Sequence, residues 1–257
     1  MIRRYVAALR PEKGASLNQN DAYSLYAALL ESLESEASCG LHEGESLISQ
    51  YLTPCAGRSE FLWTVNLIGE TSINICASAL ERLTMLELHS RGLSAAVEIT
   101  GRRQLDSLSS MSALLGDDPS CQRFVLRFLS PSAFRSGGEY VNFPSVAHII
   151  GSLCKKWNAA FPDSPMEDDD AMSMLAAGVK MTGYSLHGAS FRIKGVSIPS
   201  FSGTVTLSAR LSPPMLQLLR TLLSFAPFCG IGIKTTLGMG GVSVKESTRP
   251  ANGQRIT

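Results

Sequence analysis

Residues 230–242 read Gly-Ile-Gly-Ile-Lys-Thr-Thr-Leu-Gly-Met-Gly-Gly-Val, with five glycines in the first twelve positions. Glycine allows positive φ and the close approach of another backbone, and exposed backbone N–H groups can form a concave anion site. Lys234 and the neighbouring threonines add groups that suit phosphate. A plain helix-to-strand turn needs fewer glycines, so the segment predicts a phosphate-binding loop. The binding residues expected here are Gly230, Gly232, Lys234, Thr235, Gly238, Gly240 and Gly241.

A nucleotide-binding loop is a poorer interpretation of this stretch. A P-loop has Gly-Lys-Ser/Thr between a strand and a helix, whereas Lys234 follows Ile233 and the segment leads from a helix into a strand. The dinucleotide-binding fingerprint does not match either, because the segment leads from a helix into a strand and lacks the third glycine at the required spacing. A nucleotide-dependent enzyme is therefore disfavoured, and binding of ATP would revive it.

The two halves of the chain show the same order of predicted elements. Alternating and helically spaced apolar residues predict a strand, a helix, two strands, a helix and a strand in each half, which is the split βαβ unit. We therefore expect an α+β protein of two tandem ferredoxin-like (RRM-like, βαββαβ) domains, 1–110 and 111–257. The strands are expected at 2–9, 46–53, 60–68, 93–99, 122–129, 191–196, 204–211 and 242–244, and helices begin near 20, 71, 145 and 213.

At this point the sequence resembles a known family. The glycine-rich stretch after an apolar helix, and the segment from Leu129-Ser-Pro-Ser-Ala-Phe-Arg-Ser-Gly-Gly138 to the helix ending Lys155-Lys156-Trp157-Asn158, resemble the CRISPR repeat-processing endoribonucleases of the RAMP superfamily. The double βαββαβ order agrees with that resemblance over nearly the whole chain.

The resemblance implies a metal-independent endoribonuclease. It would bind CRISPR repeat RNA and cleave precursor crRNA by 2′-OH attack, leaving a 2′,3′-cyclic phosphate and a 5′-OH. His42 is the expected general acid or base, and Tyr26 and Tyr23 are candidates for a second catalytic hydroxyl, although Tyr26 fits the apolar helix face equally well. The family's lysine shortly after the histidine is absent from positions 43–57. The alternative function is a non-catalytic RAMP subunit that holds crRNA within an effector complex.

Charge is distributed unevenly along the chain. Residues 1–128 carry 11 Lys and Arg against 15 Asp and Glu, whereas residues 129–257 carry 12 against 7. A basic half on a nearly neutral protein suits a polyanion. Further RNA-binding candidates are Arg135, Lys155, Lys156, Arg192 and Lys194. Phe134 and Tyr140 can stack on bases or fill a core.

The remaining composition predicts no cofactor, no metal and no membrane span. Six cysteines stand singly without a Cys-x-x-Cys pair, and no stretch reaches about 18 consecutive apolar residues. The start of the chain lacks a secretory pattern, so we expect a cytoplasmic protein. The expected partners are repeat RNA, a CRISPR effector complex and, in a homodimer, a second copy. The other histidines, His89 at the end of a helix, His148 on a helix and His187 in a turn, are expected to be structural.

Overall fold

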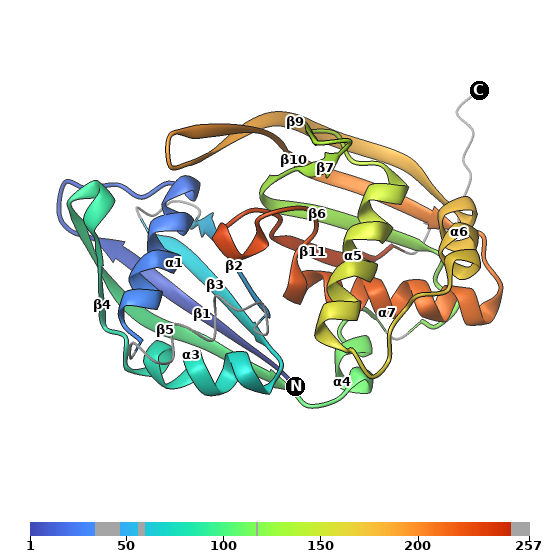
Figure 1. Cartoon of the computed structure of the whole chain (residues 1–257), viewed down its shortest axis with the longest axis horizontal. Helices are drawn as coiled ribbons and strands as arrows, with labels where there is room; N and C mark the ends of the chain where they lie inside the picture. The colour runs from blue at the N-terminus through green and yellow to red at the C-terminus, as the bar shows by residue number, and fades with distance from the viewer. Residues whose placement is uncertain (34–46, 56–59, 117, 248–257) are drawn as a thin grey trace, which may run out of the picture.

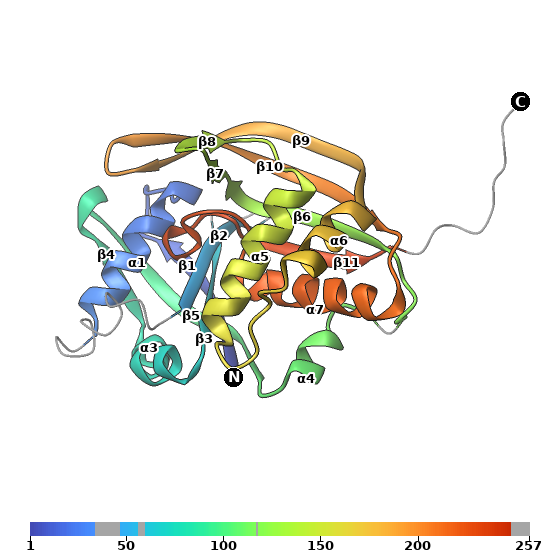
Figure 2. The same cartoon turned by 45° about the vertical axis from the view of Figure 1, so that its right-hand side comes forward.

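The computed structural model of the chain describes residues 1–33, 47–55, 60–116 and 118–247 (Figures 1 and 2). The first half forms a five-stranded antiparallel sheet in the order β2-β3-β1-β5-β4, and the apolar residues of α1 and α3 share one core with it. The elements are β1 Ile2–Pro11, η1 Gln19–Asp21, α1 Ala22–Glu31, β2 Leu47–Pro54, β3 Phe61–Ile68, α3 Glu70–Arg82, β4 Met85–Leu88, η2 His89–Arg91 and β5 Leu93–Leu105.

The second half has a four-stranded antiparallel sheet in the order β11-β6-β10-β9. Its helices α5, α6 and α7 lie on one side of that sheet, as Figure 2 shows. The elements are α4 Leu108–Ser112, β6 Arg123–Ser132, β7 Phe134–Ser136, β8 Glu139–Val141, α5 Val146–Ala160, α6 Asp169–Gly178, β9 Val179–Ile193, β10 Val196–Ala209, α7 Pro213–Cys229, η3 Thr235–Leu237 and β11 Val242–Glu246.

The prediction of two ferredoxin-like units is confirmed. Leaving out the edge strand β4, each sheet places its four strands in the same spatial order, fourth–first–third–second. The predicted division between residues 110 and 111 falls inside the short helix α4, whose Met111 packs in the core of the second half. The exact division stays a prediction.

The predicted strand at 191–196 has the wrong bounds, because only its first three residues belong to β9 and its last residue begins β10. Lys194 and Gly195 have φ angles of 48° and 79° and form the tight turn between two long strands, β9 and β10. Positive φ at both central residues matches the twist of the flanking strands, so the turn ends β9 inside the predicted strand. His187 consequently lies in β9, where its Nε2 is 2.8 Å from the hydroxyl of Ser202, and not in a turn.

The helices begin where the sequence provides caps. Ser145 accepts a hydrogen bond from the His148 N–H at the start of α5, and Pro213 opens α7, where a missing N–H is harmless. Asp168 caps α6 by accepting a hydrogen bond from the Ala171 N–H. His89 does not end a helix, because α3 stops at Arg82 and β4 intervenes.

The two halves are joined through partly buried polar contacts. Arg4 of β1 donates to Asn66 Oδ1 at 2.7 Å and to the carbonyl oxygen of Pro227, and its guanidinium lies 4.3 Å from the ring centroid of Phe228. Burial lowers the pKa of Arg4, whose charge is compensated by these contacts. Gln50 of β2 donates to the carbonyl of Thr236, which also holds the glycine-rich loop against the first half.

Candidate functional site

The glycine-rich loop is a packed joint between α7 and β11. A Cβ at Gly238 would lie 2.3 Å from Ala22 Cβ, and one at Gly232 would lie 2.3 Å from the Ala133 carbonyl oxygen. Gly230, Thr235, Gly238, Gly240 and Gly241 are buried. Buried backbone offers little surface to a ligand, so we retain the prediction of RNA contact for Gly232 and Lys234, which stay accessible.

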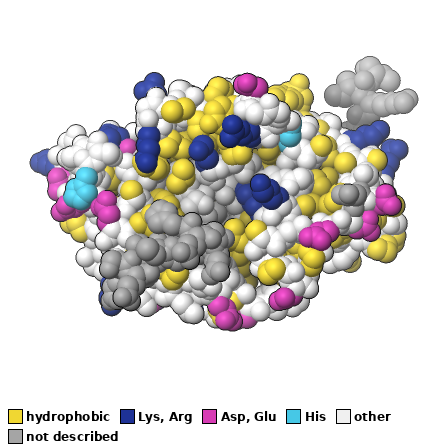
Figure 3. Space-filling model, in the orientation of Figure 1, with side chains coloured by type: hydrophobic (Ala, Val, Ile, Leu, Met, Phe, Trp, Pro, Cys, Tyr) yellow, Lys and Arg dark blue, Asp and Glu magenta, His cyan; other side chains and the backbone are white. Residues whose placement is uncertain are grey.

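A groove of about 610 Å³ lies between this loop, β7 and the exposed face of α5. Its lining includes four cations from three separate segments of the chain, all of them predicted above to bind RNA: Arg135, Lys155, Lys156 and Lys234. Its floor is largely apolar and consists of Leu47, Phe134, Ala147, Gly151, Ala159 and Ile233. Among the described residues that line it, none is Asp or Glu. Figure 3 shows Lys and Arg side chains gathered on this face of the molecule.

Helix α5 holds the loop in place through two side chains of the groove wall. The hydroxyl of Ser152 accepts from the Gly232 N–H at 2.8 Å, and the Lys156 ammonium donates to the Gly230 carbonyl at 2.9 Å. Desolvation lowers the pKa of Lys156 to about 8. A phosphate placed beside this ammonium would favour its charged form and raise that pKa again.

His148 stacks on the floor of the groove. Its ring centroid is 5.0 Å from that of Phe134 with an interplanar angle of 17°, and its Nδ1 is covered without a hydrogen-bond partner. His148 was predicted to be structural, and no role was predicted for Ser152. One pattern in the sequence could have indicated both residues. Positions 148, 152, 155 and 159 share one face of the helix, and all four carry small or polar residues.

Of the residues proposed from the first half, Tyr23 and Tyr26 lie outside the groove lining. Tyr26 is half-buried against the core of the first half, and burial raises its pKa to about 12. Tyr23 lies under the β9–β10 turn, where the Lys194 ammonium is 6.0 Å from its ring centroid. His42 lies outside the described residues.

The β9–β10 hairpin reaches across to the first half of the chain, as Figure 1 shows. The backbone N–H of Arg192 donates to Asn20 Oδ1 at 2.8 Å, which fixes the hairpin beside α1. Arg192 and Lys194 are exposed near its tip. They extend the distribution of positive charge from the groove toward the first half, but they do not line the groove.

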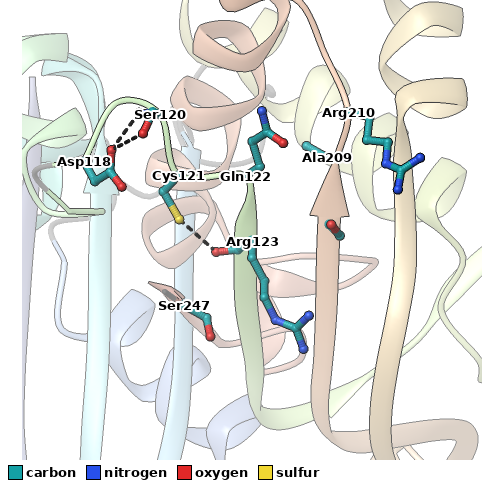
Figure 4. Close-up of a pocket in the computed structure, with 9 residues that line it drawn as sticks. Asp118, Ser120, Cys121, Gln122, Arg123, Ala209, Arg210 and Ser247 are labelled. Carbon is teal, nitrogen blue, oxygen red and sulfur yellow. Dashed lines mark hydrogen bonds between the residues drawn. The ribbon is translucent and has the colours of Figure 1, made fainter. Parts of the chain in front are cut away.

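A second depression, of about 500 Å³, lies at the opposite end of β6 (Figure 4). It contains Arg123 and Arg210, while Asp118 is occupied by hydrogen bonds from the hydroxyl and N–H of Ser120 at 2.6 and 2.9 Å. No residue predicted to be functional lines it. The groove beside α5 is therefore the stronger candidate site.

Among the described residues, no helix has both the length and the hydropathy that crossing a bilayer requires.

Comparisons with known proteins agree with one another. A family model described as CRISPR-associated endoribonuclease Cas6 matches residues 126–242, which run from β6 to β11. A CRISPR-associated endoribonuclease Cas6 of Streptococcus thermophilus is 26% identical over 89% of this chain and 93% of its own length. A CRISPR-associated endoribonuclease Cas6 of Mycobacterium tuberculosis (strain CDC 1551 / Oshkosh) is 24% identical over 86% of this chain and 70% of its own length.

Solved structures show the same fold. A Thermus thermophilus Cas6 superposes with a TM-score of 0.73 at 21% identity, covering 95% of this chain and 98% of that one. A structure described as a Cas6 product complex superposes with a TM-score of 0.76 at 20% identity, covering 95% of this chain and 100% of that one.

Proposed function

We propose that the chain is an endoribonuclease of the Cas6 family of CRISPR-associated RAMP proteins and that it binds CRISPR repeat RNA in the groove beside α5. The observation that carries the proposal is the convergence of Arg135, Lys155, Lys156 and Lys234 around an apolar floor. Cations contact phosphates, and an apolar floor accommodates bases, so the groove suits a single RNA strand. Similar solved structures are described as product and substrate-mimic complexes of Cas6, and another as a RAMP protein binding different RNA substrates, which supports RNA as the partner.

The proposed reaction is cleavage of precursor crRNA within the repeat. The ribose 2′-OH attacks the adjacent phosphorus, the bond to the 5′ oxygen breaks, and the products carry a 2′,3′-cyclic phosphate and a 5′-OH. His42 acts as general acid or base in this metal-independent step. Lys234 and Arg135 offer charge to the pentacoordinate phosphate in place of the family's missing lysine.

The tyrosines have a narrower role in this mechanism. Because burial raises the pKa of Tyr26 to about 12, its hydroxyl keeps its proton at neutral pH and can donate a hydrogen bond but does not act as a base. Tyr23 remains a candidate hydroxyl at the edge of the β9–β10 hairpin. The effector complex, the homodimer and the cytoplasmic location stay predictions.

Cleavage of labelled repeat RNA in EDTA tests the proposal directly. We expect the wild type to make one cut with a cyclic phosphate end, and His42→Ala to cut about 10²- to 10⁴-fold more slowly. His187→Ala is the matched control and should cut normally. His187 lies in β9 and its ring contacts the hydroxyl of Ser202. Cutting that survives His42→Ala would place the catalyst elsewhere. Tight binding without any cutting would favour the non-catalytic RAMP subunit.

Salt dependence of binding tests the groove. Replacing Lys155 by alanine should weaken binding of uncleavable repeat RNA and reduce the slope of log Kd against log salt by about 1, because one phosphate contact is lost. Lys180→Ala removes an exposed cation of β9 outside the groove and should leave that slope unchanged. Equal slopes for Lys155→Ala and the wild type would contradict phosphate binding at the α5 rim.

A further inference from the structure

Three aromatic side chains are exposed in the part of the chain that the structure describes. Tyr140, Phe143 and Tyr184 have 39%, 50% and 65% of their surface accessible. Phe143 and Tyr184 touch edge-to-face, with ring centroids 5.6 Å apart and an interplanar angle of 88°. Isolated exposed apolar residues are ordinary, whereas two such rings in contact form a patch that needs an explanation.

The patch adjoins segments of the chain that line the groove, although neither ring is itself part of the lining. Residues 140–143 lead directly into α5, and the first turn of that helix supplies Ala147 and His148 to the groove wall. In the β7–β8 pair, Tyr140 lies opposite Arg135, a cation of the groove rim. Figures 1 and 2 both show β7 and β9 beside the N-terminal end of α5. A strand lying in the groove therefore meets the two rings as it passes the start of the helix.

We propose that Phe143 and Tyr184 form a stacking platform for one unpaired nucleobase of the repeat RNA where the strand leaves the groove. This inference rests on the proposed function. Every base has an apolar face, so an aromatic platform beside phosphate-binding cations holds a single strand without demanding a sequence. The edge-to-face contact steadies both rings and leaves the highly exposed Tyr184 with surface free to stack.

The platform has a consequence for the substrate. A base within a duplex already stacks on both neighbours, so only an unpaired nucleotide can occupy the platform. RNA that passes the N-terminal end of α5 is therefore single-stranded at that nucleotide, and any hairpin of the repeat lies on one side of it.

Affinity measured over a salt series separates stacking from charge. Phe143→Ala and Tyr184→Ala should each raise the Kd of uncleavable repeat RNA by about 5- to 150-fold, the loss of one base–aromatic stack, with the salt slope unchanged. Phe143→Tyr and Tyr184→Phe should retain the affinity, because each keeps its ring. Met174→Ala, which removes a similarly exposed apolar side chain from α6, is the control and should bind as the wild type does.

A scan with single abasic nucleotides locates the base. At one position, removing the base should weaken binding to the wild type. The same abasic RNA should bind Phe143→Ala as tightly as intact RNA does. Wild type that binds and cuts RNA while both alanine variants bind it equally well would overturn the platform alone. Variants that change only self-association in sedimentation would assign the patch to a second copy and overturn it too. A wild type that binds no repeat RNA would overturn both this inference and the proposed function.

Discussion

Replacing Glu246 by alanine is expected to lower the free energy of unfolding by about 3 to 5 kcal/mol. The Glu246 carboxylate of β11 forms an ion pair with the Arg220 guanidinium of α7, and the two side chains are only 13% and 7% exposed. Arg220 also donates to the carbonyl oxygen of Gly116 at 3.2 Å. Without Glu246, the guanidinium would remain desolvated and lack its counter-charge, which costs more than the pair itself contributes.

A double replacement distinguishes that cost from simple loss of packing. Arg220→Met with Glu246→Met removes both charges while keeping apolar volume, and it should be close to neutral or stabilising. Urea unfolding followed by fluorescence of the buried Trp63 and Trp157 measures both free energies. A single Glu246→Ala change that costs less than about 1 kcal/mol would show that the pair behaves like an exposed one.

Gly232→Ala is the second change with a large expected effect, a loss of about 3 kcal/mol of stability. The residue has φ of 95°, and its added Cβ would lie 2.3 Å from the carbonyl oxygen of Ala133, a backbone atom that cannot rotate away. Either the loop or the end of β6 must move. Since Gly232 lines the groove, that movement should also weaken RNA binding.

Gly188→Ala is the matched control for that substitution. Gly188 lies in β9, its φ lies outside the left-handed region, and an added Cβ would meet no atom within 4 Å. Its replacement should leave both stability and RNA affinity close to those of the wild type. Equal stability of the Gly232→Ala and Gly188→Ala proteins would mean that the loop adapts at little cost.

The sheets were predictable from sequence where strands are half-buried and alternate, as in β6. Strand β9 was missed except for its last three residues, because it is an edge strand with only three buried residues, so burial imposes little apolar pattern on it. Strand β4 is only four residues long, and Met85 and Glu87 are both exposed. Sequence patterns cannot separate so short a strand from the end of the preceding helix.

The site was predictable in its charges but less so in its shape. The sequence identified Arg135, Lys155 and Lys234, and folding brings them to one groove. The loop glycines were harder to interpret, because close packing and phosphate binding both require the absence of Cβ. The aromatic pair could not be foreseen, since Phe143 and Tyr184 are far apart along the chain and meet only when β9 lies beside the start of α5.

The contacts of Arg4 affect the order in which the protein folds during synthesis. Its partner carbonyl, on Pro227, is 223 residues further along the chain. During synthesis the N-terminal half emerges first. The Arg4 guanidinium on its sheet therefore has no acceptor from α7 until nearly the whole chain has been translated. The glycine-rich loop follows a few residues later and packs against Ala22 of the first half. The first half thus reaches its final form only when the last helix and loop arrive, so the groove is completed in the same late event.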